Sequence, residues 1–534
     1  MDPNKSEQKS ETLVSPHMEI DLEHISGKAG TLVVAPGFGD HPKEHLGEET
    51  ISQLKTTADG RFILIPQPPD DPEHVLNWSW RKKHLILFVL FYSTLMTDMT
   101  SAWAIPLVIS QSEYWGISTT NAGRNISGNV FMIGAGGLAA VPLTRWVGRL
   151  PILFWAISIA FILNIAASAT PGWMSYLVIR CMQGFVITSP QVVGLSMIHD
   201  MFFFHEHARK IGIWAFSIIF SPVIGPLISG VIVNYASWRT SSWVNTGLLA
   251  IGVILIVLFG QETAHGDEQT HVSSSKSSPS MTERLVARAK LLTGITGYQA
   301  YHNGVKHTIQ DMCIVATRPH FLCVCVYYLL SFMWSIGINV TLTLFFVPPP
   351  PVGYGYSTLT VSLFYFSPII GMFLGELFGH WFNDFIFTRH IKRSRGVYEP
   401  EVRLWMVWIS VVLLIGSLVL YGYALADKMP WIGPVMAYGI YGFGLVTQTV
   451  AITAYASDVF PDHTVEASSI INAFRVWGGF IVNYFLVNWA ESDGPVVSFG
   501  AQAGIVGGAF LLIITVQVFG SRWRGAFPSP KKQT

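Results

Sequence analysis

The chain alternates between long apolar runs and short polar connections. A helix needs about 20 mostly apolar residues to cross the hydrocarbon core of a bilayer. Six such runs precede residue 260 and six follow residue 320, at 85–106, 125–143, 151–169, 173–197, 210–234, 243–260, 321–346, 357–385, 404–424, 431–455, 465–489 and 499–520. The pattern therefore predicts an all-α membrane protein with twelve transmembrane helices, six on each side of a long polar stretch.

The positions of lysine and arginine orient these spans. Cytoplasmic connections of membrane proteins are enriched in both residues. If the N-terminus is inside, the outside connections hold only Arg124, Arg239 and Lys428, two arginines fall within spans, and all the others lie inside. We therefore expect both termini in the cytosol. The predicted units are a cytosolic tail at 1–84, a helical half at 85–260, a cytosolic loop at 261–320, a second half at 321–520 and a cytosolic tail at 521–534.

Composition excludes several classes of function. Charged residues make up only 12% of the chain, about half the share in soluble proteins, and the formal net charge is zero. That balance gives no electrostatic reason to expect a nucleic-acid partner. The four cysteines and the histidines show no metal-ligand spacing, and no nucleophile cluster or phosphate-binding glycine loop is present. We expect no cofactor, no metal and no enzymatic activity. His205 and His207 are expected on a solvated face of an inside connection.

Three short motifs carry a family resemblance. The connection VPLTRWVGRLPILF contains Gly148 and Arg149, span four contains Arg180, Gln183 and Gly184 as R-x-x-Q-G, and span five contains Gly225, Pro226 and Gly230 in SIIFSPVIGPLISGVI. In these motifs and in its span layout the sequence resembles the major facilitator superfamily, over roughly residues 71 to 525. Two longer stretches are similar to a fungal branch of the superfamily, HDMFFFHEHARKIG after span four and GELFGHWFNDFIFTRHIKRSRGVYEPEVRLW from span eight into span nine. That branch resembles drug:proton antiporters and includes organic-cation and polyamine permeases.

The match to the first motif is partial. Arg145 stands where the family has an aspartate, and Val141 stands at the leading glycine. The carboxylate that usually pairs with the arginines of this connection is therefore missing, which argues against the usual gating ion pair in this chain. In the second half, Asp384 precedes a basic stretch at the inner end of span eight, which is the charge order expected at a cytosolic helix end.

Four charged residues lie away from the ends of the predicted spans: Asp98, Arg180, Glu376 and Arg475. Because an ionised side chain is costly in hydrocarbon, such residues line cavities, pair with one another or change protonation. The family architecture implies that their four spans line a central cavity. Two interpretations of Asp98 remain open, a proton or cation site and a helix-end charge at a water-filled outer mouth.

Aromatic and amide side chains supply further candidates. Those that the resemblance implies for a substrate cavity are Trp334, Asn339, Tyr365, Gln448, Tyr455 and Asn472. For each one alone, a contact between helices is the more common role of such a residue. A cavity with acids and aromatics suits amphipathic or cationic ligands.

The resemblance implies two six-helix bundles that rock around a central cavity, in a monomer of the plasma membrane. The expected function is proton-coupled export of a small organic molecule such as a drug, toxin or secondary metabolite. Asp98 and Glu376 would carry protons or cations, with Arg180, Gln183 and Arg475 as coupling candidates. The alternatives are proton-driven import of organic cations or polyamines and a sensor that does not transport.

Overall fold

The computed structural model describes residues 31–32, 55, 64, 68–72, 74–263, 281–295, 305–350, 353–393 and 397–528. Most of the predicted N-terminal tail and much of the central loop lie outside these ranges. In the described part of the chain, twelve helices are long and apolar enough to cross a membrane. The prediction of an all-α protein with twelve spans is confirmed.

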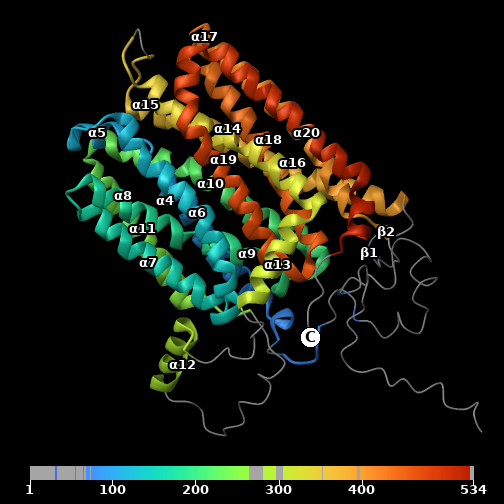
Figure 1. Ribbon diagram of the computed structural model, residues 1–534. Helices are drawn as coiled ribbons and strands as arrows, with labels where there is room; N and C mark the ends of the chain where they lie inside the picture. Colours follow the sequence, from blue (N-terminus) through green and yellow to red (C-terminus); the bar gives the residue numbers. More distant parts are fainter. Residues whose placement is uncertain are drawn as a thin grey trace, which may run out of the picture.

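The first half forms one bundle (Figure 1). Span four consists of two helices, α8 and α9, and the short α5 follows span one. The helices are α4 (Trp80–Ala102), α5 (Val108–Trp115), α6 (Thr119–Val147), α7 (Arg149–Ala169), α8 (Trp173–Ile187), α9 (Ser189–Met201), α10 (Phe204–Tyr235) and α11 (Trp238–Phe259).

The second half forms the other bundle, in which span eight consists of α15 and α16. The helices are α14 (Pro319–Phe346), α15 (Thr358–Leu363), α16 (Phe366–Arg393), α17 (Met406–Ala426), α18 (Ile432–Val459), α19 (Thr464–Ser492) and α20 (Pro495–Ala526). Short 3-10 helices are η3 (Val75–Asn77), η6 (Pro400–Trp405) and η7 (Pro461–His463). The strands β1 (Thr31–Leu32) and β2 (Val397–Tyr398) pair antiparallel.

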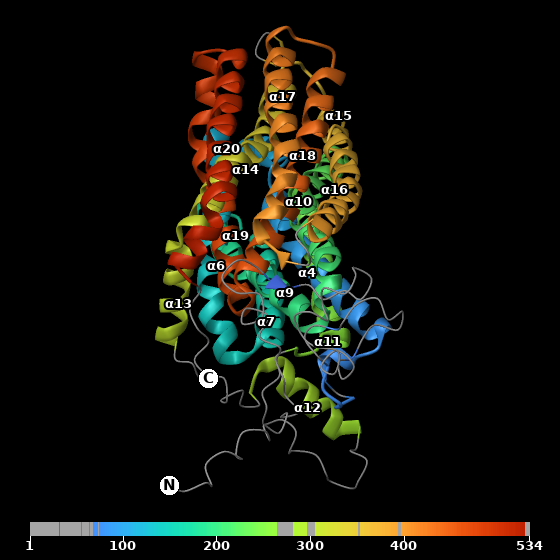
Figure 2. The same ribbon diagram turned by 90° about the vertical axis from the view of Figure 1, so that its right-hand side faces the viewer.

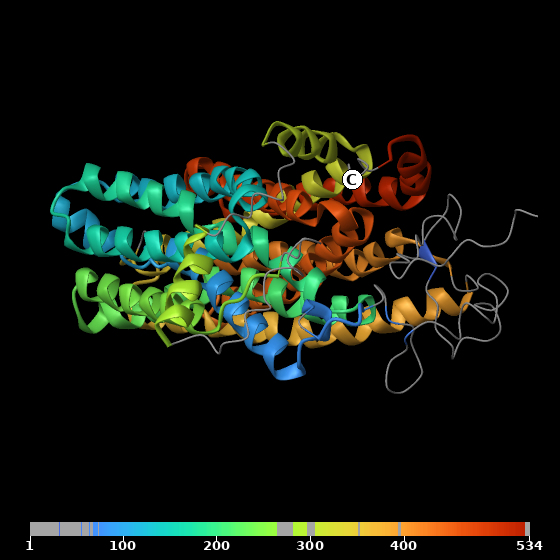
Figure 3. The same cartoon turned by 90° about the horizontal axis from the view of Figure 1, so that it is seen from below.

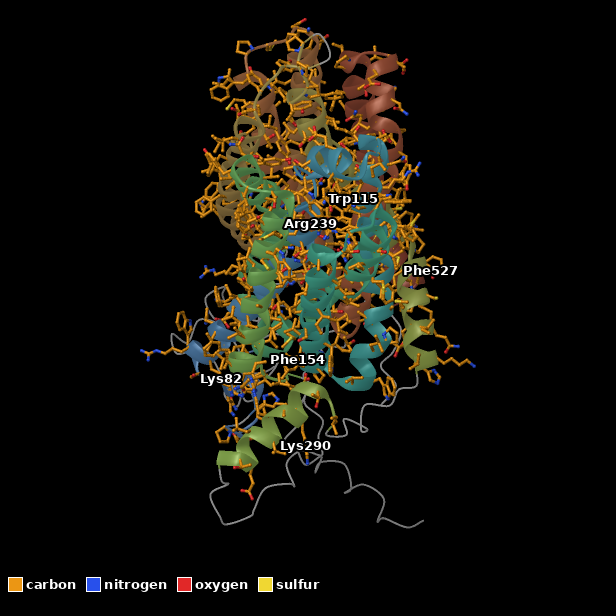
Figure 4. All side chains as sticks on the ribbon, turned by 90° about the vertical axis from the view of Figure 1, so that its left-hand side faces the viewer. Lys82, Trp115, Phe154, Arg239, Lys290 and Phe527 are labelled. Carbon is orange, nitrogen blue, oxygen red and sulfur yellow. The ribbon has the colours of Figure 1, made fainter. Side chains whose placement is uncertain are left out.

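Two helices connect the bundles, α12 (Met281–Thr293) and α13 (Val305–Thr317). Figure 2 shows α12 at the opposite end of the molecule from the tips of α17 and α20. Lys82 and Lys290 lie toward the α12 end, well separated from Trp115 and Arg239 (Figure 4). Viewed from below, helices of the two halves meet along the middle of the molecule (Figure 3).

Local sequence signals set the helix ends. Ser79, Ser118, Ser237 and Ser357 each accept a hydrogen bond from a backbone N–H three residues later, which caps α4, α6, α11 and α15. Gly148 has φ +100° and joins α6 directly to α7. Since residues with a Cβ rarely adopt this backbone conformation, glycine makes the abrupt connection possible.

Several span boundaries differ from the prediction by a few residues, and at the start of span six the reason is clear. Span six begins at Trp238, whereas the apolar pattern began at 243. Polar residues of its first turns face the bundle interior, where Ser241 Oγ accepts a hydrogen bond from Trp103 Nε1 at 3.0 Å. Asn245 donates there to Asn164 Oδ1 at 3.3 Å. Hydropathy alone cannot recognise a helical turn whose polar groups are satisfied by its neighbours.

Candidate functional site at the interface of the two bundles

A buried ion pair joins the two bundles. Asp98 of α4 lies with its Oδ2 2.7 Å from an NH2 of Arg475 in α19, and the two side chains are 8% and 3% exposed. Arg475 also donates to Gln191 Oε1 at 3.0 Å and to Asn472 Oδ1 at 2.8 Å. Spans one and eleven are thus connected by opposite charges away from water. Sequence reasoning selected both residues but did not predict that they meet.

The cost of breaking this pair is large. Removing one partner of a buried pair typically costs about 3–5 kcal/mol, because the other charge stays buried without compensation. The pair spans the contact between the halves, so separating the bundles here requires another partner for each charge. A proton on Asp98, or a cation beside it, would meet that requirement.

Further polar contacts between the bundles surround the pair. Asn472 of α19 donates to Thr188 Oγ1 at 3.1 Å, and Ser468 donates to the backbone carbonyl of Gln191 at 3.0 Å. Trp477 donates to the backbone carbonyl of Phe131 in α6 at 3.2 Å. Span eleven is therefore bonded to both span two and span four of the other half.

The proline-rich helix α10 makes a second contact between the bundles. Pro226 has no N–H, so the carbonyl of Pro222, one turn earlier, lacks its usual donor within the helix. Asn339 of α14 donates its Nδ2 hydrogen to that carbonyl at 3.2 Å. The carbonyl of Ile218, freed by Pro222 in the same way, accepts from Ser221 Oγ at 2.9 Å. A defect created by the motif in span five is thus filled by a side chain of span seven.

Motif glycines allow backbones to approach closely. A Cβ on Gly225 would lie 2.6 Å from the carbonyl oxygen of Met99 in α4, and one on Gly230 would collide with Ser362 of α15. A Cβ on Gly184 would collide with the backbone of Asn129. Since real Cβ atoms do not approach so closely, these positions admit no larger residue in this packing.

Glu376 stands apart from the ion pair. Glu376 packs closely against α10: a Cβ placed on Gly212 would lie only 2.7 Å from Glu376 Oε1. Its Oε2 is buried without a hydrogen-bond partner among the described residues. The structure thus places Glu376 at the contact between spans five and eight. The side chain of Asp384, farther along α16, lies outside the described residues.

Arg180 and Gln183 lie within the first bundle. Arg180 NH1 donates to Gln183 Oε1 at 2.7 Å and its NH2 to the carbonyl of Ser101 at 2.9 Å. Gln183 in turn donates to Asn164 Oδ1 at 3.0 Å. The two motif residues share one helix face, as their spacing predicts, and they connect spans one, three and four.

The substrate-cavity candidates divide into three groups. Asn339 and Asn472 lie at the interface described above, and the hydroxyl of Tyr365 donates to the carbonyl of Asn339 at 3.1 Å. Gln448 lies within the second bundle, where it accepts from Tyr327 and donates to Ser331. The remaining two, Trp334 and Tyr455, are buried, and their N–H and O–H groups have no partner among the described residues.

Charge pairs repeat at one end of both bundles. Arg149 pairs with Asp200 at the end of α9, and Arg403 pairs with Asp458 at the end of α18. The carboxylate absent from the first motif is thus supplied by span four, which sequence reasoning missed. Its only signal was the equivalent position in the second half, an aspartate at the end of span ten.

The burial of His207 contradicts its prediction. It was expected on a solvated face, but its side chain is only 7% exposed. Burial lowers the pKa of His207 to about 4, partly opposed by its hydrogen bond with the carbonyl of Phe202 at 2.8 Å. The helical start of α10 folds this residue inward against the end of α9, where its ring lies 4.2 Å from that of His199.

Comparisons with known proteins support the same architecture. The family model described as Major Facilitator Superfamily matches residues 87–483. The multidrug transporter TPO1_2 of Candida glabrata is 25% identical, covering 82% of this chain and 74% of that protein. The cycloheximide resistance protein of Candida maltosa is 24% identical, covering 84% and 83%.

Among solved structures, the proton:xylose symporter XylE of E. coli superposes with a TM-score of 0.58 at 14% identity. That match covers 84% of this chain and 100% of the symporter chain. At this identity the likeness concerns the fold alone.

Proposed function

This chain belongs to the major facilitator superfamily, and from that premise we propose that it exchanges protons for a small organic molecule across the membrane. Members of this superfamily are secondary transporters, not enzymes. The observation that carries the proposal is the Asp98–Arg475 ion pair, buried between the two bundles. In it, a group that can take up a proton holds the two halves together.

Protonation would act on the pair as follows. A proton that binds a carboxylate oxygen of Asp98 removes the negative charge and with it the attraction to Arg475. The guanidinium keeps Asn472 of its own helix as a hydrogen-bond acceptor, so its release costs less than its complete isolation would. The two bundles then separate at spans one and eleven, as alternating access requires.

The driving force is of the right size. Moving one elementary charge through a potential of 100 mV yields about 2.3 kcal/mol. One pH unit across the membrane adds about 1.4 kcal/mol per proton. Together these approach the cost of about 3–5 kcal/mol for breaking a buried pair. Coupling to one proton is therefore energetically reasonable at this site.

The proposed substrate is an amphipathic organic molecule, and the proposed direction is export. A cationic group can take the place of Arg475 beside Asp98, and Phe332, whose ring centre lies 5.1 Å from that guanidinium, offers an aromatic face. The drug-related names of the two fungal relatives support export. Cytosolic termini are proposed from the lysine and arginine distribution. A plasma-membrane location is proposed because export from the cell requires it.

A flux assay tests the proposal. Purified protein in liposomes that contain a pH-sensitive dye is exposed to a panel of amphipathic cations and polyamines. We expect substrate-evoked proton movement in the wild type and in Asp427→Asn, a control at the exposed end of α17. We expect its loss in Asp98→Asn. Proton movement that survives Asp98→Asn would remove Asp98 from the coupling path. Proton-driven uptake of a tested compound would instead favour the alternative function, import of organic cations or polyamines.

A further inference from the structure

The guanidinium of Arg180 is buried without an acidic partner. Its side chain is 3% exposed, and both of its acceptors, Gln183 Oε1 and the Ser101 carbonyl, are neutral. No carboxylate of the described residues pairs with it, and its Nε has no hydrogen-bond partner among them. Arg475, the other arginine inside a span, has Asp98 as a counter-ion. The first bundle therefore carries an uncompensated positive charge.

Burying an unpaired charge has a large free-energy cost. Removing an ion from water into a protein interior costs several kcal/mol unless an opposite charge and hydrogen bonds compensate. Two neutral acceptors satisfy part of the hydrogen-bonding capacity of Arg180 and leave its charge unbalanced. A small anion beside the guanidinium would supply what the protein does not.

A small polar cavity lies against this arginine. It sits inside the first bundle among the ends of α4, α7, α8 and α11. Its lining combines amide, hydroxyl and aromatic groups with small residues, and it contains no carboxylate: Trp103, Ala104, Leu107, Asn164, Ala167, Tyr176, Arg180, Ser242 and Asn245. Its size suits a single water or a monatomic ion.

Tyr176 contributes a second donor. Its hydroxyl oxygen accepts a hydrogen bond from Gln111 Nε2 at 3.0 Å, which leaves its own proton available as a donor, and Tyr176 is one of the residues that line the cavity. The ring is held by Trp115 at 5.2 Å and Trp238 at 5.9 Å between ring centres. These aromatic rings pack around Tyr176 and fix the position of its ring.

We propose that this cavity is a binding site for one small monovalent anion, with chloride as the physiological occupant. The anion accepts hydrogen bonds from Arg180 Nε and from the Tyr176 hydroxyl and neutralises the guanidinium. A water molecule would satisfy the same donors but leave the charge uncompensated, so the anion is favoured. The site is separate from the Asp98–Arg475 pair and does not depend on the transported substrate.

Radiolabelled chloride binding tests the site. The full-length protein, purified in detergent in gluconate buffer without any substrate, should bind one chloride per chain saturably. Arg180→Gln should reduce the affinity at least about tenfold, since a hydrogen bond to a charged group contributes about 1.5–3 kcal/mol. Arg524→Gln is the control, because it removes an arginine that has its own carboxylate, Glu401, and does not line the cavity, and it should retain chloride binding.

A cavity-filling variant keeps the test valid if Arg180→Gln fails to fold. Ala167→Leu places extra carbon atoms in the cavity while Arg180 remains, and it should abolish chloride binding. In the wild type, chloride and bromide should raise the thermal unfolding midpoint saturably at constant ionic strength, and the larger iodide should raise it less. No saturable binding by the wild type, or equal binding by Arg180→Gln, would overturn the proposal.

Discussion

A double-mutant cycle on Asp98 and Arg475 measures how strongly the two bundles are held at their centre. Asp98→Asn removes the negative charge and leaves a buried guanidinium, and Arg475→Gln leaves a buried carboxylate. Each single substitution should lower the free energy of unfolding by about 3–5 kcal/mol. Because both side chains are almost wholly buried, solvent screens little of this cost.

The double variant should be less destabilised than the sum of the two single variants. With both charges gone, no uncompensated ion remains, and an amide beside an amide can still form a hydrogen bond. We expect an interaction energy of about 2–3 kcal/mol, at the upper end of values for residues in contact. The assay is equilibrium unfolding of the purified protein in mixed detergent micelles at neutral pH.

The control cycle pairs Asp98→Asn with Arg524→Gln. Arg524 forms its own ion pair with Glu401 at 2.8 Å in the second bundle and makes no contact with Asp98. These two substitutions should add within about 0.5 kcal/mol. If Asp98 and Arg475 are equally additive, the pair does not hold the bundles together and the reasoning is wrong.

Three further predictions follow from the packing and the protonation of other groups. Gly225→Val should abolish folding or transport because its Cβ meets the backbone of α4, whereas Gly247→Ala, with open space around it, should preserve both in expression and flux assays. Asn339→Leu should lower the free energy of unfolding by about 1–3 kcal/mol, because it leaves the backbone carbonyl of Pro222 in α10 without a hydrogen-bond donor. Adding Pro226→Ala, which restores a backbone N–H in α10, should recover part of that stability, and no recovery would refute this explanation. The pKa of His207 is about 4 in the folded protein, against a reference value of 6.5. Between these values the unfolded chain binds a proton that the folded protein does not, so the free energy of unfolding should fall by up to about 3 kcal/mol from pH 6.5 to pH 4. His207→Gln should flatten that decline in a series of thermal unfolding measurements, and an unchanged pH profile in the variant would contradict this assignment.

The fold could be read from the sequence because its main determinant is local. Each span is a run of apolar residues long enough to cross a bilayer, and no distant contact is needed to recognise it. Gly148 and the serine caps are local signals of the same kind. Span six was predicted five residues short because its polar first turns, including Ser241, are satisfied only by contacts with other helices.

The site was only partly predictable. The cost of charge in hydrocarbon identified Asp98 and Arg475, but their pairing depends on how two bundles pack, which no local pattern encodes. Asp200 was missed as the partner of Arg149 because the chain brings it there from the end of another helix. The hydrogen bond of Asn339 to the carbonyl of Pro222 in α10 is equally non-local. The sequence indicates only that Pro226, which has no N–H, leaves the carbonyl one turn earlier without its usual donor.

In the proposed mechanism, a proton on Asp98 releases Arg475 and lets the bundles separate. Spin labels at Thr120 and Ala426, exposed residues on the two bundles, report the separation of the halves after Cys181, Cys313, Cys323 and Cys325 are replaced. Lowering the pH should shift the distance distribution of the wild type toward a second population. Asp98→Asn, which mimics the protonated carboxylate, should show that population at every pH. A distribution in the wild type that does not change with pH, or one in Asp98→Asn that still responds to pH as the wild type does, would contradict the mechanism.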